Sequence, residues 1–190
     1  MSDKNRTPTQ SELDFIKDKE LKRTIEDSIQ YLSLIFDSAK KSSSDLYKEE
    51  TYRVIILYVI SIIEAILLHV LKKRGEKMTH IQYKFASPIQ ESFKHAELPH
   101  SPVVIAVQKE ETKDERRIGL ADLVAFMEKR NLMSETFATK ILDTNDIRNT
   151  FHFTKPRNKI TCEIKTVENA LELLVDTIKK APKAIAHKEK

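Results

Sequence analysis

The sequence predicts a mainly α-helical fold, a bundle of about five helices with a small β-hairpin insertion. Only 2 glycines occur among 190 residues, which leaves little material for the tight turns of an all-β protein. Apolar residues recur at three- and four-residue spacing along most of the chain, as they do on the buried face of a helix. One stretch, residues 76–118, instead has the short alternating runs that are typical of strands.

The first predicted helix is a surface helix, and the second is the central helix of the bundle. The first should end in the serine cluster 42–44, and its stripe predicts the buried residues Leu21, Ile25, Ile29, Leu32 and Phe36. The second should begin near Asp45 and end at Gly75. Because it is apolar on nearly all sides from Val54 to Leu71, we expect neighbours on several sides, including a partner subunit.

A membrane span is the competing interpretation of this second helix, since its apolar run approaches the minimum length for one. Ser61, Glu64 and His69 interrupt the run. A carboxylate near the middle of a span costs about 2.5 to 3.5 kcal/mol on insertion scales. We therefore expect no membrane span.

The segment 76–118 is predicted to be a small β-hairpin or ribbon between helices. Its strands are expected in "HIQYKF" and "VVIAVQ", and "KEETKDERR" is expected to be a charged connector. Because Pro88, Pro99 and Pro102 fall between the two runs, the residues around them should be irregular or form one short helix.

Three further helices are expected after this insertion. One should end at Asn131, and its stripe comprises Leu120, Leu123, Val124 and Met127. Ser134 can cap the next, which should run toward Pro156 and carry Phe137, Ile141, Ile147 and Phe151. The last should start at Thr166 after "KITCEIK", with inward residues Val167, Ala170, Leu171, Leu174, Val175 and Ile178.

Length and composition predict one cytoplasmic domain. Residues 12–180 should form this domain, between a disordered N-terminus at 1–11 and a flexible tail at 181–190. The net charge of +4 and pI near 9.0 permit an RNA partner but do not require one. With Cys162 as the single cysteine and no cluster at zinc-ligand spacing, we expect no intramolecular disulfide, metal or cofactor. The first 30 residues lack the apolar core of a signal peptide.

Three elements in order resemble the HEPN family. These are "SIIEAILLHVL", "LADLVAFMEKRNLM" and "DIRNTFHF", in which Arg148 and Asn149 are closely followed by His152. HEPN proteins are helical homodimers, and many are metal-independent RNases of toxin–antitoxin or defence systems, whereas others only bind. The resemblance implies that Arg148, Asn149 and His152 form the motif, that the chain is a homodimer, and that RNA and an antitoxin or other protein are its partners.

Arg148 and His152 have chemistry that suits RNA cleavage. Residues four apart share one face of a helix, so both side chains could contact one phosphate. Arginine binds phosphate oxygens, and histidine exchanges protons near neutral pH. Asn149, Lys155 and Arg157 are predicted to bind or orient the RNA. Because separate acid and base require two histidines, a two-fold dimer would supply them in one cleft.

Structural roles are the alternative for the same residues. Cations in the last turns of a helix interact favourably with the helix dipole and need no ligand. Glu64 is a predicted supporting residue that could pair with Arg148, or it could lie on one wet stripe of its helix. The alternative function is a non-catalytic dimerisation module that binds a protein partner or a nucleotide.

Overall fold

The computed structural model describes residues 10–85, 93–95, 98–103, 106–151 and 162–187. The chain divides into two compact units, a helical unit made of Met1–Glu76 with Gly119–Lys190, and a β unit, Lys77–Ile118. Five α-helices and a small antiparallel hairpin confirm the predicted fold class. The β unit is inserted between the second and third α-helices.

The first two α-helices begin at side-chain caps. After a short 3₁₀-helix, η2 (Gln10–Leu13), α1 runs Lys19–Lys41, and the Asp18 carboxylate accepts the backbone N–H groups of Glu20 and Leu21. Helix α2 runs Asp45–Lys73, and its Ser44 hydroxyl accepts the N–H of Tyr47. These caps satisfy donors that have no partner within a helix, which explains why the serine cluster separates the two helices.

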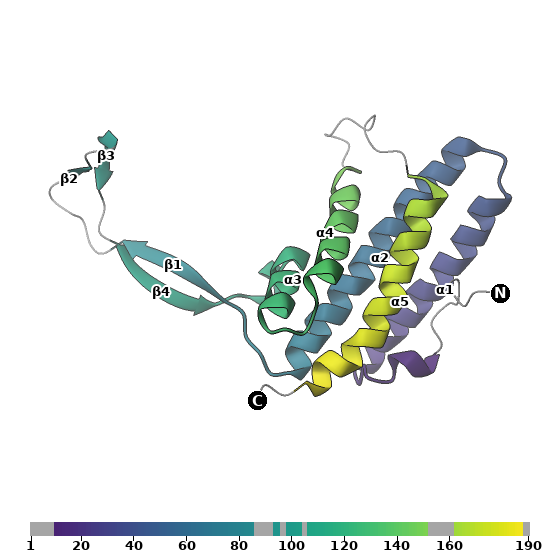
Figure 1. The fold of residues 1–190 in the computed structure, drawn as a ribbon, viewed down its shortest axis with the longest axis horizontal. Coiled ribbons are helices and arrows are strands. Elements are labelled where there is room, and N and C mark those ends of the chain that lie inside the picture. The colour runs from purple at the N-terminus through teal and green to yellow at the C-terminus, as the bar shows by residue number, and fades with distance from the viewer. Residues whose placement is uncertain (1–9, 86–92, 96–97, 104–105, 152–161, 188–190) are drawn as a thin grey trace. The chain divides into compact units, whose positions relative to one another are not determined.

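Helix α2 is the centre of the helical unit, where it packs against α1, α3, α4 and α5 (Figure 1). Its buried face includes Ile55, Ile60, Ile63 and Ile66, which have no exposed surface. By length and composition α2 could cross a membrane, but 61% of its most apolar window is buried inside the protein. Burial against neighbouring helices therefore explains most of its apolar character.

Helix α2 also has a stripe that neighbouring helices leave uncovered. Between Thr51 and Leu71 every residue off this stripe is buried. The stripe, called the apolar stripe below, follows three- and four-residue spacing and consists of Val54, Leu57, Tyr58, Ser61, Glu64, Ala65 and Leu68. Unlike the outer face of an ordinary surface helix, it carries one charge only.

Helices α3, α4 and α5 complete the helical unit. Helix α3 runs Leu120–Lys129, α4 runs Glu135–Asn149 from a Ser134 cap, and α5 runs Ile164–Ala186. The predicted core of α3 is confirmed, since Leu120, Leu123, Val124 and Met127 are all buried. In α5 two predicted inward residues, Leu171 and Val175, are half-buried, whereas Leu173 and Thr177 are buried instead.

The predicted flexible tail from residue 181 is wrong for its first half, because α5 continues to Ala186. Arg74, buried at the end of α2, donates hydrogen bonds to the carbonyls of Ala184, at 2.9 Å, and His187. Its guanidinium also pairs with Glu76 at 3.2 Å, and Glu76 in turn pairs with Arg130 at 3.0 Å. These contacts satisfy terminal carbonyls of α5, so the helix end is tied to the bundle.

The β unit contains two short antiparallel pairs. Strand β1 (Thr79–Phe85) pairs with β4 (Ala106–Thr112), and β2 (Phe93–His95) pairs with β3 (Leu98–Val103). The hairpin prediction is confirmed, but two details are wrong. Lys109–Thr112 belong to β4 and not to the predicted charged connector, and Pro99 and Pro102 lie in β3. Every strand of a two-stranded sheet is an edge strand, which tolerates proline. Pro88 lies outside the described residues.

Candidate functional site at the end of α4

Arg148 and Asn149 are the last two residues of α4, and both are half-buried. The Arg148 guanidinium donates a hydrogen bond of 3.4 Å to the side-chain oxygen of Asn145. The following turn is closed by Thr150, whose backbone N–H and hydroxyl both bond the Ile147 carbonyl, at 3.0 and 2.7 Å. The candidate arginine therefore lies at a defined helix end.

The helix that carries Arg148 ends earlier than predicted. The prediction placed Arg148 and His152 on a helix running toward Pro156, whereas α4 ends at Asn149 and passes into a turn at Thr150 and Phe151. The apolar spacing of Phe151 suggested a longer helix, but the Thr150 contacts compete with helical continuation. His152, Lys155 and Arg157 lie outside the described residues.

Arg148 differs from the other described arginines of the helical unit. Those four form ion pairs, Arg23 with Asp27, Arg53 with Glu49, and both Arg74 and Arg130 with Glu76. Among the residues that the structure describes, no carboxylate pairs with Arg148. A half-buried guanidinium without a neutralising partner keeps its charge for an anionic ligand.

Arg53 is a neighbouring residue that the sequence analysis missed. Its guanidinium lies 5.6 Å from the centre of the Phe151 ring, and its side chain is 9% exposed. Glu49 pairs with it at 2.5 Å and Glu50 at 3.6 Å. The glutamate–arginine spacing of four residues in "EETYR" is the signal that could have found this pair. Because two carboxylates balance its charge, Arg53 supports the site structurally.

Cys162 lies near the same pair, just before α5, and is buried. Burial raises the pKa of its thiol to about 11, a rise that Glu49 reinforces and Arg53 opposes. The thiolate is the reactive form of cysteine, so this thiol is chemically quiet at neutral pH. Cys162 is therefore a core residue and gives no support for cysteine chemistry.

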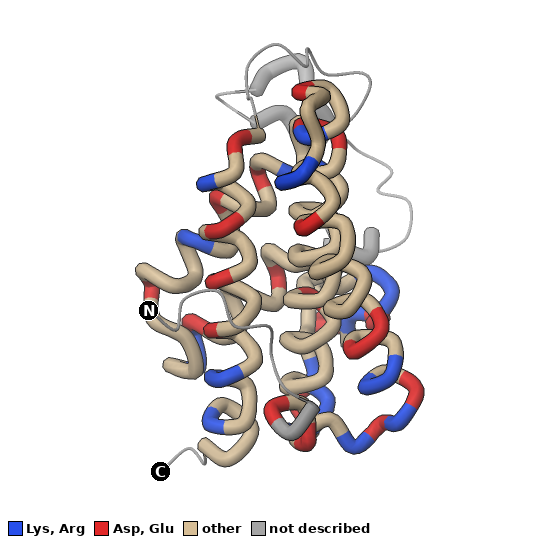
Figure 2. The backbone as a smooth tube through the Cα atoms, turned by 90° about the vertical axis from the view of Figure 1, so that its right-hand side faces the viewer, with Lys and Arg blue, Asp and Glu red and all other residues tan. Residues whose placement is uncertain are grey.

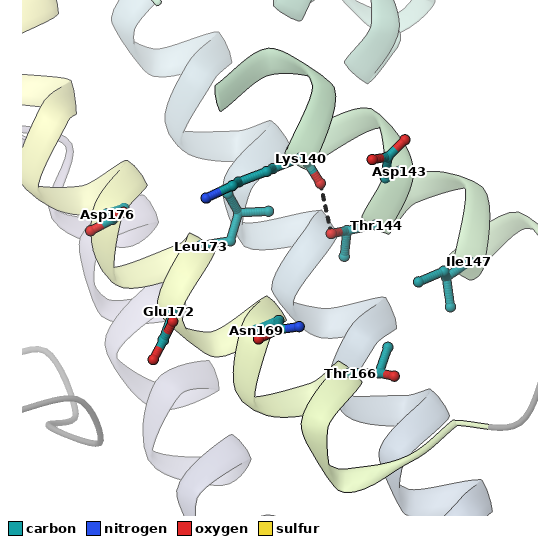
Figure 3. Close-up of a pocket in the computed structure, with 9 residues that line it drawn as sticks. All are labelled: Lys140, Asp143, Thr144, Ile147, Thr166, Asn169, Glu172, Leu173 and Asp176. Atoms are coloured by element: carbon teal, nitrogen blue, oxygen red, sulfur yellow. Dashed lines mark hydrogen bonds between the residues drawn. The ribbon is translucent and has the colours of Figure 1, made fainter. Parts of the chain in front are cut away.

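A groove of about 430 Å³ lies between α4 and α5, and Ile147 at its edge precedes Arg148 (Figure 3). Helices α4 and α5 pack closely near the start of α4, where Phe137 is buried and Lys180 lies 3.4 Å from the centre of its ring. Toward the end of α4 the two helices no longer fill the space between them, and this space is called the α4–α5 groove below. Its lining consists of Lys140, Asp143, Thr144, Ile147, Thr166, Asn169, Glu172, Leu173 and Asp176.

The α4–α5 groove is acidic. Asp143, Glu172 and Asp176 contribute three carboxylates, and Lys140 is the only cation in the lining. Ile147 and Leu173 add apolar surface, and the Thr144 hydroxyl is already engaged with the Lys140 carbonyl at 2.8 Å. RNA phosphates would be repelled by this lining, so the groove favours a cationic occupant.

Two other predicted assignments can be placed. Glu64 is half-buried on the apolar stripe and has no ion pair within the described part of the chain. Phe151 contacts Arg53, and Glu64 lies about 16 Å further along α2, so of the two alternatives for Glu64 the structure favours a place on the outer stripe of its helix over a pairing with Arg148. His69 is 5% exposed, as expected of a core histidine, and burial lowers its pKa.

Among the described residues, no group of three or more histidine, cysteine or carboxylate side chains could hold a metal ion. Lys and Arg are interspersed with Asp and Glu along the backbone of the described helices (Figure 2). Comparison with protein-family models, curated proteins and solved structures found no match.

Proposed function

We propose that the chain is a homodimer that acts on RNA as a metal-independent endoribonuclease, of the kind found in toxin–antitoxin or defence systems. The observation that carries the proposal is the half-buried Arg148 guanidinium, which lacks a carboxylate partner in the described part of the chain. A phosphate is the anionic group that a planar guanidinium binds best, through two parallel hydrogen bonds. Asn149 beside it can donate or accept a further hydrogen bond.

The proposed cleavage requires Arg148 and His152 of one subunit together with His152 of the partner subunit. One His152 takes the proton of a ribose 2′-OH, whose oxygen attacks the adjacent phosphorus. His152 of the partner subunit, in its protonated form, gives a proton to the departing 5′ oxygen. Arg148 stabilises the charge that develops on the phosphate oxygens, and the products are a cyclic phosphate and a free 5′-OH.

The test is cleavage of a generic single-stranded RNA by the purified protein in EDTA. His152→Ala should slow cleavage by a factor of about 10² to 10⁴, the usual contribution of acid–base catalysis. Arg148→Ala should weaken RNA binding or cleavage by about 10- to 150-fold, as expected when a contact of about 1.5 to 3 kcal/mol is lost. The wild-type cleavage rate should show a bell-shaped pH profile near neutrality, and this profile should be lost in His152→Ala.

Arg23→Ala is the matched control, because Arg23 is 84% exposed on α1 and pairs only weakly with Asp27 at 3.7 Å. It should leave RNA activity and stability unchanged. Cleavage that disappears with chelator would contradict the metal-independent mechanism. A wild-type protein that neither cleaves nor binds RNA would remove the proposal altogether.

The acidic α4–α5 groove favours a second candidate function, recognition of a protein partner. Three carboxylates beside the apolar side chains of Ile147 and Leu173 suit an amphipathic segment that carries lysine or arginine beside leucine-type side chains. Such a partner would occupy the groove beside Arg148, where it could also control access of RNA. This candidate needs no catalysis and corresponds to the alternative of a binding module.

A synthetic amphipathic peptide of leucine and lysine tests this second candidate. Glu172→Gln combined with Asp176→Asn should weaken its binding and reduce the salt dependence, because two of the attracting charges are gone. Asp37→Asn on the exposed side of α1 is the control and should change neither. Equal affinities for the wild type and the double variant would exclude the groove as the binding surface.

A further inference from the structure

Arg53 of α2 contacts the turn that follows Arg148 at the end of α4. It is buried, and its guanidinium lies 5.6 Å from the centre of the Phe151 ring. The backbone N–H of Phe151 in turn donates a hydrogen bond of 3.1 Å to the Arg148 carbonyl. Two successive contacts therefore link a buried cation of α2 to the backbone of the residue that is proposed to bind phosphate.

The Arg53 guanidinium is itself held in a fixed place. Glu49 pairs with one of its terminal nitrogens at 2.5 Å and Glu50 with the other at 3.6 Å, both from the preceding turn of the same helix. A planar guanidinium with both terminal nitrogens engaged has little freedom to rotate. Because a cation over an aromatic face is attracted by that face, the place of the Phe151 ring follows from that of Arg53.

Stability alone does not explain a buried arginine at this position. An apolar side chain of similar volume often stabilises a core as much as a buried ion pair does, or more. The Nε–H of Arg53 is also buried without a hydrogen-bond partner among the described residues, which adds to the cost of burying the side chain. What the arginine provides beyond packing is a fixed position for the aromatic ring next to Arg148.

We infer that Arg53 is a positioning residue for RNA cleavage, which holds Arg148 in place through the Phe151 ring. This inference rests on the proposed function and adds to it a residue that need not touch the RNA. Cleavage depends steeply on such placement, because a displacement of about 1 Å can slow a reaction by about 100-fold. Loss of the contact between Arg53 and Phe151 should therefore lower the rate while the Arg148 charge is still present.

Arg53→Lys tests the inference, because it keeps the charge and removes the planar group. With a generic single-stranded RNA in EDTA, kcat should fall by up to about 100-fold, whereas KM should change little. Phe151→Leu should give the same result, and Phe151→Tyr, which keeps an aromatic face, should restore nearly the wild-type rate. The double variant Arg53→Lys/Phe151→Leu should be no slower than the slower single variant, since both changes remove one contact.

Arg130→Lys is the matched control. The Arg130 guanidinium also lies 5.6 Å from the centre of an aromatic ring, that of Phe126, and it also pairs with a glutamate, Glu76 at 3.0 Å. This contact lies at the end of α3 and does not involve the turn after Arg148. Arg130→Lys should therefore leave kcat and KM unchanged. All rates are compared at a temperature at which the thermal unfolding curve shows every variant to be folded.

Other outcomes would overturn the inference. A wild-type protein that neither cleaves nor binds RNA would remove the proposed function and this inference with it. Wild-type cleavage together with full rates in Arg53→Lys and Phe151→Leu would overturn this inference alone. The same holds if these variants unfold at lower temperature and their folded fraction cleaves normally, because Arg53 is then only a structural residue. Additive losses in the double variant would mean that Arg53 and Phe151 act separately, and would also overturn it.

Discussion

Helices α2 and α5 pack against each other, yet their outer faces differ in character. The outer face of α5 is polar and includes Lys165, Asn169, Glu172, Asp176 and Lys179, whereas the outer stripe of α2 is apolar apart from Ser61 and Glu64. Water can hydrogen-bond the polar side chains on the outer face of α5, whereas exposure of the apolar stripe of α2 to water is unfavourable. The difference shows that the apolar composition of α2 exceeds what its own fold buries.

The largest expected effect is on the free energy of unfolding, and it should differ between the buried face and the outer stripe of α2. Ile63→Ala should lower the free energy of unfolding by about 2 to 5 kcal/mol, because Ile63 is fully buried and truncation leaves a cavity. Leu57→Ala, on the apolar stripe, should cost less than about 1 kcal/mol in the isolated subunit. Urea unfolding at low protein concentration measures both. Equal losses would mean that Leu57 belongs to the monomer core.

The end of α5 provides the next test, since it is held to α2 by polar contacts. Arg74→Ala should destabilise the protein by about 2 to 4 kcal/mol, because it leaves Glu76 and the α5 carbonyls without their donor. Hydrogen exchange should show faster exchange in the last turns of α5 than elsewhere. An unchanged exchange pattern would show that packing alone holds the helix end.

The smallest expected effect concerns pH. Burial lowers the pKa of His69 in the folded state, helped by Lys73 and Lys72 and opposed by a Phe15 backbone hydrogen bond and Asp18. The unfolded chain therefore binds this proton more readily than the folded chain does. Stability should be complete above the unfolded pKa of about 6.5 and should fall as pH drops toward the folded value, by at most about 1.4 kcal/mol per pH unit.

His69→Gln should flatten this part of the pH profile while the rest of the profile is retained. Thermal unfolding from neutral pH down to weakly acidic pH provides the measurement. Asp14 and Lys22 form an exposed pair at 2.7 Å, and the Lys22 ammonium lowers the Asp14 pKa, so any loss at still lower pH belongs to such carboxylates. A profile identical to that of the wild type would show that His69 does not titrate with folding.

Most helices could be predicted from the sequence, because periodicity reports directly on burial. Helix α1 follows its stripe from Ile25 to Phe36, and α2 begins at the predicted Asp45. The end of α4 was placed too late because Phe151 continues the apolar spacing, whereas local hydrogen bonds of Thr150 decide where the helix stops. Spacing describes a face and carries little information about helix ends.

The candidate site was less predictable than the fold. Arg148 could be selected from a short motif, but its lack of an ion pair among the described residues depends on which carboxylates the bundle brings near it. The α4–α5 groove arises where two helices that are close at Phe137 no longer fill the space between them near Ile147. Such features depend on contacts between distant parts of the chain, which a single sequence does not report.

The β unit begins and ends at one place, since the backbone N–H of Lys113 donates to the Met78 carbonyl at 2.7 Å. This contact closes the ladder of β1 and β4, so the hairpin shortens the effective connection between α2 and α3. Loop-closure entropy grows only with the logarithm of length, about 0.6 kcal/mol for each doubling, and the paired strands reduce even that cost. The helical unit should therefore accept replacement of residues 79–112 by a short glycine–serine linker with little change in its own stability.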